Sequence, residues 1–487
     1  KDSIWAMETP LREPVPDRLH GTCARSQSPW TYNIVHGLTA TALYGLGPGL
    51  YQFSVLPSFI LVVGGSNFDV GFAEGLQGIS NMISALPAGY LADKWSRRAC
   101  IRLGCCMQLV GGICLLLAIF LAKPGSIHAF VLLCASLCIQ GVCDGITNGP
   151  MVALMDDSCP AGRRSDVETA NTVTYMAATS LGPMIGLIVF ITKQDRWTLD
   201  AMKWVIAIGV VIGQLAIFPA WRMDDRKALG EQSEAVYMQQ RLNTAAEGQE
   251  GEARELVARA GRSTCFGIVT VQRVRGFFFF GELVLSLGAG MTVKFFPVFF
   301  NVECHEDPAT VQTVFASLSL LCAVGTLLAN KVAKRVGRMQ VVIPCFMVGI
   351  TCTLLLGSLR GLYTTPGVMI PLFMVRCSIM WSTGALKGSV IADYTPKSQR
   401  ARWKALESIT AMGWSGSAAL GGFLIDQFGY GLTFVITGCF QATVIPLWFL
   451  LLPIVAKESE LLAAAEVADS SVPAAVSGIS MSPCQEE

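Results

Sequence analysis

The feature that most constrains this chain is a series of apolar runs, each long enough to cross a lipid bilayer. An α-helix needs about 20 mostly apolar residues to span the hydrocarbon core. Because a lipid-exposed backbone must satisfy its own hydrogen bonds, such runs predict helices. Twelve runs qualify, and we expect an all-α membrane protein with twelve transmembrane helices, at residues 33–63, 70–92, 99–122, 127–155, 166–192, 200–221, 276–300, 309–331, 339–360, 366–392, 403–425 and 431–455.

The composition agrees with this class and excludes others. Hydrophobic residues make up 52% of the 487-residue chain and charged residues 15%, whereas soluble domains carry about 25% charged residues. The net charge of +1 creates no field that would attract nucleic acid. The sequence has no recognisable nucleophile–base group, phosphate-binding loop or metal-binding spacing of Cys and His. We therefore expect no enzyme activity, no cofactor, no metal site and no nucleic-acid partner.

The first apolar run is interrupted by Gly45, Gly47, Pro48 and Gly49. Pro and Gly are tolerated inside membrane helices when neighbouring helices satisfy the freed backbone groups. We therefore expect one kinked helix rather than two short ones.

Polar segments divide the chain into five parts. The central polar stretch is rich in charged helix formers, so part of it is expected to form a surface helix, and the Ala- and Ser-rich tail is expected to be disordered. The predicted parts are a polar N-terminal segment (1–32), a six-helix bundle (33–222), a central loop (223–275), a second six-helix bundle (276–455) and the tail (456–487).

Lys and Arg predict the orientation, because short cytoplasmic loops are enriched in them. Loops on one side carry only Lys123, Lys193, Arg196 and Arg360. The side that holds the central loop and both termini is predicted to be cytoplasmic, since its short loops carry thirteen: Lys94, Arg97, Arg98, Arg163, Arg164, Lys331, Lys334, Arg335, Arg338, Lys397, Arg400, Arg402 and Lys404.

An internal repeat relates the two halves at an offset of 236 residues. Asp157, Pro160 and Arg164 follow the fourth run, and Asp393, Pro396 and Arg400 follow the tenth at the same spacing. The same offset pairs Gly89 with Gly325 and Gly186 with Gly422. Two equivalent halves joined by a loop predict pseudo-symmetric bundles that can rock against each other around a central site.

The loop after the second run carries the most specific motif. It contains Gly89, Asp93, Lys94, Arg97 and Arg98, and Ser96 directly precedes Arg97. This pattern resembles the signature loop of the major facilitator superfamily, Gly-x-x-x-Asp-(Arg/Lys)-x-Gly-Arg-(Arg/Lys), with Ser96 in place of the usual Gly. The resemblance covers residues 33–455, and it implies the major facilitator fold.

The resemblance also implies that this loop is a cytoplasmic gate. Asp93 would lie against the N-terminal end of the eleventh helix, where the helix dipole is positive, and Arg97 and Arg98 would pair with acids such as Asp156 or Asp157. The simpler alternative is that the basic residues only retain the loop in the cytoplasm. The predicted gate residues are Gly89, Asp93, Lys94, Arg97, Arg98, Asp157, Arg164, Asp393 and Arg400.

Three charges lie deep inside predicted spans, and such charges are candidates for functional sites. Asp144 has Gln140 and Asn148 one turn on either side, which places all three on one helix face. Arg376 is the repeat partner of Gln140, and Lys294 lies in the outer half of the seventh span. The resemblance implies that the first, fourth, seventh and tenth helices line the cavity, so that all three charges would face it.

Weaker candidates accompany these charges. Tyr44 and Gln52 flank the interruption of the first span, so we expect them to hydrogen-bond a solute. The alternative for the deep charges is an ion pair, Asp144–Arg376 or Asp144–Lys294, that only holds the halves together. Glu74, Glu282 and Lys387 lie near span ends, so we expect them at the membrane interfaces. Trp381 and Trp414 are candidates for cavity walls or for ordinary packing, and we expect packing.

The leading hypothesis is a secondary active transporter that moves a small organic solute by rocker-switch alternating access. Two positive deep charges against one negative favour an anionic or zwitterionic solute, and protons are a candidate coupling ion. Alternatives are a drug or metabolite antiporter, a lipid carrier, or a transport-inactive receptor or accessory subunit, since a fold does not determine function. The expected partners are the lipid bilayer and a small-molecule substrate, and a monomer would suffice.

Overall fold

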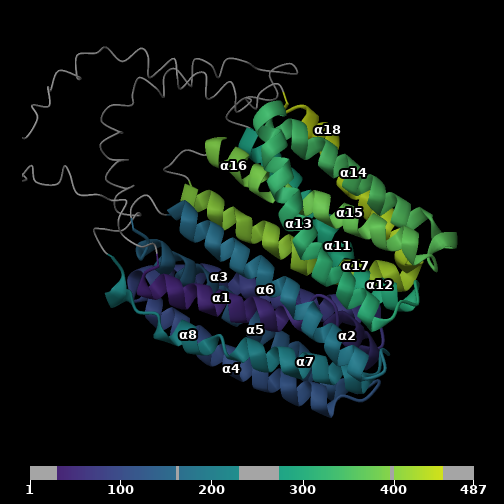
Figure 1. Cartoon of the computed structure of the whole chain (residues 1–487), viewed down its shortest axis with the longest axis horizontal. Helices are drawn as coiled ribbons and strands as arrows, with labels where there is room; N and C mark the ends of the chain where they lie inside the picture. Colours follow the sequence, from purple (N-terminus) through teal and green to yellow (C-terminus); the bar gives the residue numbers. More distant parts are fainter. Residues whose placement is uncertain (1–29, 161–163, 230–273, 395–399, 453–487) are drawn as a thin grey trace, which may run out of the picture.

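The computed structural model describes residues 30–160, 164–229, 274–394 and 400–452, and these are helical throughout most of their length. We call the described residues 30–229 the N lobe and 274–452 the C lobe. In Figure 1 the helices of each lobe lie together, and the two groups meet along one side. The terminal segments, most of the predicted central loop and its expected surface helix lie outside the described residues.

The N lobe contains eight α-helices and one short 3₁₀ helix. They are α1 (Tyr32–Tyr51), α2 (Leu56–Gly64), α3 (Asn67–Lys94), α4 (Arg97–Leu121), α5 (Ile127–Asp157), α6 (Arg164–Thr192), α7 (Leu199–Gln214), α8 (Ile217–Arg222) and η1 (Asp225–Lys227).

The described helices of the C lobe follow the same order of long and broken elements. They are α11 (Val274–Val293), α12 (Phe296–Val302), α13 (Pro308–Val336), α14 (Arg338–Ser358), η3 (Arg360–Leu362), α15 (Pro366–Ser382), α16 (Gly384–Tyr394), α17 (Arg400–Ala442) and α18 (Val444–Phe449).

Nine of the described helices are long and apolar enough to cross a membrane, and the bent pair α1–α2 raises this number to ten. Two segments account for the difference between these ten candidate spans and the twelve predicted. The 28-residue α3 interleaves its apolar residues with Glu74, Gln77 and Asn81. The 43-residue α17 is interrupted by the non-helical Gly429, and an unbroken helix of that length would measure about 65 Å, twice the bilayer core. The all-α membrane fold is confirmed, and the count of twelve stays a prediction.

The break in the first span lies one turn later than the Gly-rich sequence suggested. α1 is helical through Pro48 to Tyr51, and α2 leaves it at an angle of 46° after residues 52–55. Gly47 packs directly on the backbone of Gly213 in α7, where any larger side chain would collide. The glycines therefore serve close helix packing, and the bend lies beyond them.

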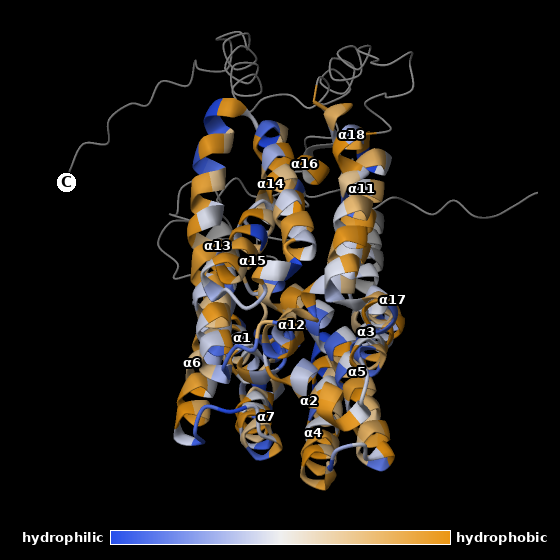
Figure 2. Cartoon of the chain, turned by 90° about the vertical axis from the view of Figure 1, so that its right-hand side faces the viewer, coloured by the Kyte–Doolittle hydropathy of each residue, from blue (hydrophilic) through white to orange (hydrophobic). Residues whose placement is uncertain are grey.

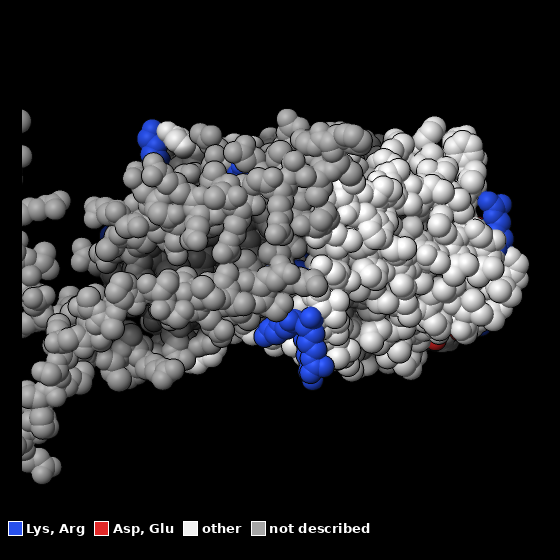
Figure 3. Space-filling view, turned by 90° about the horizontal axis from the view of Figure 1, so that it is seen from above, with Lys and Arg blue, Asp and Glu red and all other residues white. Residues whose placement is uncertain are grey.

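Uncharged surface covers the outside of both lobes. Figure 2 shows apolar residues over most of the outer helix faces, with hydrophilic residues at helix ends and between the lobes. On the face shown in Figure 3, the described surface has Lys and Arg only near its edges and a broad uncharged area between them. Such a band fits contact with lipid.

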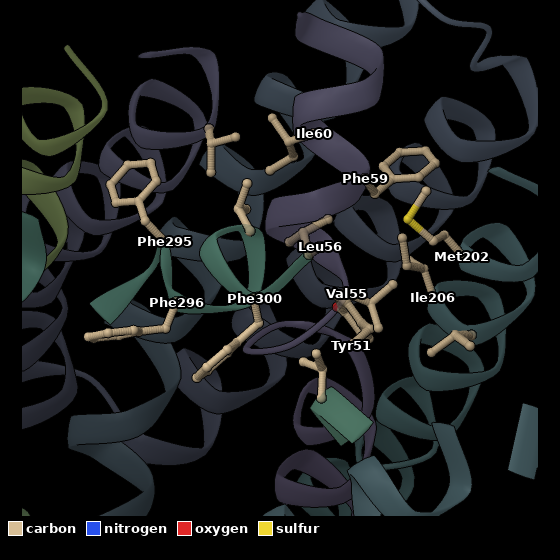
Figure 4. Packing of buried hydrophobic residues seen from close by; sticks show 14 of the residues in the cluster. Tyr51, Val55, Leu56, Phe59, Ile60, Met202, Ile206, Phe295, Phe296 and Phe300 are labelled. Carbon is tan, nitrogen blue, oxygen red and sulfur yellow. The ribbon is translucent and has the colours of Figure 1, made fainter. Parts of the chain in front are cut away.

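We call the end where α3 ends and α4 begins the basic end, and the end where α4 ends and α5 begins the far end. At the far end one large apolar core takes side chains from both lobes, and Leu56 and Ile60 of α2 lie near Phe295, Phe296 and Phe300 there (Figure 4). Toward the basic end the described core divides into separate clusters, one in each lobe. The lobes therefore share a core at one end only.

Three helix pairs carry the contact between the lobes: α3 with α17, α6 with α13, and α2 with α12. On α3, Gly71 lies against the backbone of Ala418 and Gly78 against Ser415. Near the basic end of the same helix, a side chain added at Gly89 would meet nothing within 4 Å, and Leu86 and Tyr90 are exposed. The lobes thus approach closely in the far half and separate toward the basic end.

Candidate functional site

Three neighbouring cavities run from the N lobe to the C lobe. The first, of about 380 Å³, includes Asp144 in its lining, and the second, of about 290 Å³, includes Lys294. The third, of about 440 Å³, includes Arg376. Tyr175 and Met176 line both the first and the second cavity, and Trp381 and Trp414 line both the second and the third. Because they share these lining residues, the three cavities adjoin one another and form a series, and each has one of the three deep charges in its lining.

Asp144 is the centre of a polar network in the N lobe. The Tyr44 hydroxyl donates to Asp144 Oδ1 at 2.6 Å, and Gln77 Nε2 lies 3.5 Å from Asp144 Oδ2. Gln52 Nε2 in turn donates to Gln77 Oε1 at 3.2 Å. These bonds join α1, α3 and α5 around one carboxylate, and they leave it without a cationic partner among the described residues.

The helix face predicted from the spacing of polar residues on α5 lies along this network. Gln140 and Gln52 line a small space of about 30 Å³ beside Asp144, and Asn148 lines the first cavity together with Tyr44 and Asp144. The five side chains predicted for the N lobe therefore surround connected space. Whether they contact a solute stays a prediction.

Arg376 lies on the opposite side of the series, in the C lobe. Its side chain is 2% exposed and is held by uncharged groups. Arg376 Nε donates to Thr353 Oγ1 at 3.1 Å and Nη2 to Thr292 Oγ1 at 3.3 Å, and the guanidinium lies 5.1 Å from the centre of the Phe296 ring. Hydroxyls and an aromatic face hold the cation in place without neutralising it.

Lys294 pairs with a residue that the sequence suggested to be interfacial. Lys294 Nζ donates to Glu74 Oε2 at 2.7 Å, and both side chains are buried. The considered pairings of Asp144 with Arg376 or Lys294 are therefore not present among the described residues. The expectation for Glu74 was wrong because its helix, α3, begins at Asn67 and carries it beneath the lobe interface.

A second acid–base pair was also not predicted from the sequence. Lys387 Nζ donates to Glu282 Oε2 at 2.9 Å, and both residues line the third cavity beside Arg376. They were expected at the membrane interface because each lies near a span end. The broken tenth span, α15 and α16, instead brings Lys387 back over α11.

Trp381 and Trp414 were expected to pack, and they line the cavities instead. Their ring centres are 6.3 Å apart, and Trp381 is 42% exposed. They come from the tenth and eleventh spans, and α6 and α13 also contribute to the second cavity. The walls of the described cavities are thus broader than the four helices implied by the resemblance.

The charges of the series balance once these partners are included. Glu74 neutralises Lys294, and Glu282 neutralises Lys387. Asp144 and Arg376 remain, one in each lobe, as charges held by neutral donors or acceptors. The two-to-one excess of positive charge that favoured an anion in the sequence is therefore not a property of the folded cavity.

The far end is closed by hydrogen bonds between the lobes. Asp426 of α17 accepts from Asn67 N at 3.0 Å and from Phe68 N at 2.8 Å, so its carboxylate caps the N-terminus of α3. The Tyr430 hydroxyl donates to Asn67 Oδ1 at 2.7 Å, and buried Ser54 Oγ donates to Gln312 Oε1 at 3.1 Å. These contacts close the far end.

The described gate residues at the basic end pair within the N lobe. Arg97 forms an ion pair with Asp157, as the resemblance implies. Arg98 pairs instead with Asp224 at 2.6 Å. The side chains of Asp93, Arg164, Asp393 and Arg400 lie outside the described residues, and Lys94 is exposed beside Tyr90.

Ser96, which replaces the usual Gly of the motif, has a defined role. Its hydroxyl oxygen accepts from Ala99 N at 3.2 Å and caps α4, and the hydroxyl donates to Asp225 Oδ2 at 2.6 Å. The hydrogen bond from the backbone N–H of Arg226, aided by Arg98, lowers the pKa of Asp224 from its ordinary value. The motif loop is therefore tied to the segment that follows α8.

Comparison with known proteins identifies the family. The sequence profile of the Major Facilitator Superfamily matches residues 37–402 and, in a second match, 278–483. The mouse MFS-type transporter SLC18B1 is 26% identical over 216 residues, which are 43% of this chain and 45% of that protein. An uncharacterized transporter of Buchnera aphidicola, BU466, is 28% identical over 144 residues, 28% of this chain and 34% of that protein. Each match covers less than half of the relative's length.

Solved structures share the fold at low identity. The inward-open xylose transporter XylE from E. coli aligns with a TM-score of 0.59 and 15% identity, covering 85% of this chain and 95% of that one. A bacterial homologue of the iron transporter ferroportin, in an inward-facing state, aligns with a TM-score of 0.61 and 12% identity, covering 85% and 98%. The profile match spans most of the membrane helices, and the chain belongs to the major facilitator superfamily.

Proposed function

We propose that the protein is a secondary active transporter that moves a small organic solute by rocker-switch alternating access. One observation carries the proposal: adjoining cavities, one in the N lobe, one between the lobes and one in the C lobe, reach from Asp144 to Arg376, while the lobes close at the far end only. Charges this deep are expensive in a membrane protein unless they serve a wet pathway or a ligand. Relatives and structural neighbours that are transporters support the same reading.

The arrangement of charge favours a solute that carries both signs. Asp144, in the N lobe, can bind a cationic group of the solute, and Arg376, in the C lobe, can bind an anionic group of the solute. The aromatic side chains of Tyr175, Trp381 and Trp414 line the cavity between these two charges. They favour a solute with an apolar or flat surface between its charged groups. We therefore propose a zwitterionic organic solute, with protons as the coupling ion. An anionic solute is the second candidate, because Arg376 has no acidic partner among the described residues.

The proposed orientation places the basic end, and both termini, in the cytoplasm. The described conformation then faces inward, because the far end is closed. In an outward-facing state, the Asp426 contacts with α3 would part and the motif loop would approach the start of α17. A monomer contains all of these parts.

The test begins with a thermal-shift screen of metabolites on the purified protein, because a ligand stabilises the state that it binds. Uptake of the best compound into proteoliposomes is then measured for wild type, Asp144→Asn and Arg376→Ala. Loss of a charged contact costs about 2 kcal/mol, or about 30-fold in affinity, so both variants should lose most uptake at low solute concentration.

Two matched controls separate charge at the site from charge elsewhere. Asp200→Asn removes a carboxylate that pairs with Lys193 on the N lobe surface, and Arg360→Ala removes an arginine of η3. Neither lines the cavities, and both should transport like wild type. Tight binding without flux under any gradient would contradict transport and favour a receptor.

A further inference from the structure

Among the side chains that the structure describes, one ion pair joins the two lobes. Glu74 of α3 and Lys294, between α11 and α12, lie 2.7 Å apart and are 2% and 7% exposed. Every other ion pair between two described side chains lies within one lobe: Arg97–Asp157, Arg98–Asp224, Lys193–Asp200 and Glu282–Lys387. A movement of the lobes that separates α3 from α11 therefore breaks this pair and leaves the others intact.

The two partners differ in what remains to them after separation. Lys294 directly follows the last residue of α11, where the partial negative charge of the helix C-terminus favours a cation. Glu74 lies past the first turn of α3, which begins at Asn67, and its Oε1 is buried with no hydrogen-bond partner among the described residues. A buried carboxylate that loses its cation is strongly unfavourable. Lys294 can leave the pair far more easily than Glu74 can remain without it.

Access to the two partners differs as well. Lys294 lines the second cavity, about 290 Å³ in volume, where the Phe53 ring lies 5.4 Å from its ammonium. Glu74 lines none of the four cavities described above. An organic anion in the cavity therefore reaches Lys294, whereas only a proton is small enough to reach Glu74.

We propose that Glu74 is a proton-binding site that becomes occupied when an organic anion replaces the Glu74 carboxylate as the partner of Lys294. The anion forms an ion pair with the Lys294 ammonium, and the Glu74–Lys294 pair breaks. The Glu74 carboxylate then binds one proton. One anion and one proton bind together, so the net charge of the site is unchanged and no bond other than the O–H bond forms. This inference rests on the proposed transport function and assigns its coupling residue.

The charges around Glu74 support this exchange. Lys294 is its only described cationic partner, and the apolar α2 contributes no charged side chain. Gln77, one turn further along α3, belongs to the Asp144 network and carries no charge. Other titratable groups on α3 and on the elements around it include Asp69, Tyr90 and Lys94 of α3, Tyr51 of α1, Asp144 and Asp157 of α5, Asp426 and Tyr430 of α17, and Arg97 and Arg98 of α4.

Infrared difference spectroscopy on the purified full-length protein tests the proposal without any solute. A protonated carboxyl has a C=O stretch that a carboxylate lacks. Lys294→Gln at neutral pH should show one more protonated carboxyl per chain than wild type. The double variant Lys294→Gln with Glu74→Gln should lose that band. Absence of the band in Lys294→Gln, or its survival in the double variant, overturns the proposal.

The pair of Glu282 with Lys387 supplies the matched control. It has a similar N–O distance, 2.9 Å, but lies within one lobe and is more exposed, at 21% and 16%. Glu282 Oε1 is also buried without a hydrogen-bond partner among the described residues, but Glu282 and Lys387 both line the third cavity, from which water can reach the freed carboxylate. Lys387→Gln should therefore show no new band, and a band of equal size would overturn the specific role of Glu74. Lys294→Met, an apolar replacement of similar length, serves if Lys294→Gln does not fold.

A second arm tests the exchange with an anion. Succinate and its neutral analogue succinamide are added to wild-type protein, and the melting temperature and the infrared band are followed together. A stabilising shift by succinate should bring the Glu74 band, and a shift without the band overturns the exchange. If neither probe binds, the variant spectra alone decide. Since the spectra require no flux, a protein that binds but does not transport would refute the proposed function and leave this result standing.

Discussion

At the far end the lobes share one apolar core and are tied by Asp426 and Tyr430, whereas at the basic end each lobe has its own core and the described ion pairs stay within one lobe. The far-end bonds join helices of different lobes. The basic-end bonds of Arg97 and Arg98 instead hold the motif loop to its own lobe. The difference shows which contacts a rocking movement must exchange and which it can carry along.

The largest effect is expected where the lobes cross. Gly71→Val places a branched side chain against the Ala418 backbone, and overpacking of this kind costs about 1–3 kcal/mol. The melting temperature should fall and transport should be lost. Gly89→Val on the same helix meets open space in this state and should leave the melting temperature near that of wild type. Equal losses in both variants would show that α3 is not held more tightly at the far end.

The next effect concerns the tie between the lobes. Asp426→Ala removes a carboxylate that accepts three hydrogen bonds, from Asn67 N, Asn67 Nδ2 and Phe68 N. Losing such charged bonds costs about 2 kcal/mol, which corresponds to about a 30-fold shift toward a state that is open at the far end. Hydrogen–deuterium exchange of α2 and α12 should rise. Asp200→Ala, at the same end but paired within its lobe, is the control and should not change it.

A smaller effect is expected from the pair within the basic end. Asp157→Asn removes the partner of Arg97, and the two side chains are 36% and 24% exposed. Exposed pairs contribute less than about 1 kcal/mol, so the melting temperature should change little and exchange at the far end should stay as in wild type. An effect as large as that of Asp426→Ala would contradict the assignment of this pair to one lobe.

The smallest effect is a pH dependence near the motif loop. The pKa of Asp224 is lowered by the backbone N–H of Arg226 and by Arg98. Since the folded-state pKa lies below the unfolded one, the carboxylate stabilises the fold above about pH 4. That contribution is lost as the pH falls through the folded-state pKa. The melting temperature of wild type should therefore drop more than that of Asp224→Asn on acidification from neutral pH, and parallel curves would contradict the role of Asp224.

The fold was more predictable from the sequence than the site. Lipid requires long apolar helices and leaves few alternatives, so the runs, the repeat and the motif loop predict the architecture. Asp144, Gln140 and Asn148 follow from helical spacing alone. The sequence did not predict the partner of Lys294, because a pair between α3 and α11 depends on how the lobes meet rather than on any local pattern.

Other misses have the same origin. Gln77 carries no charge and lies in the most polar span, so nothing in the sequence distinguished it, yet it joins Gln52 to Asp144. Glu282 and Lys387 lie near span ends and pair only because α16 turns back over α11. The exposure of Trp381 follows from the separation of the lobes at the basic end, which is a property of this conformation.

Distances between spin labels across the lobes test the central claim most directly. Labels at Lys123 and Gly361 report the far end, and labels at Lys94 and Lys334 report the basic end, introduced through a non-canonical amino acid so that the 17 cysteines remain. We predict that Asp426→Ala lengthens the far-end distance and shortens the basic-end distance in the same population. A far-end distance that grows while the basic-end distance stays unchanged would contradict alternation between the two ends.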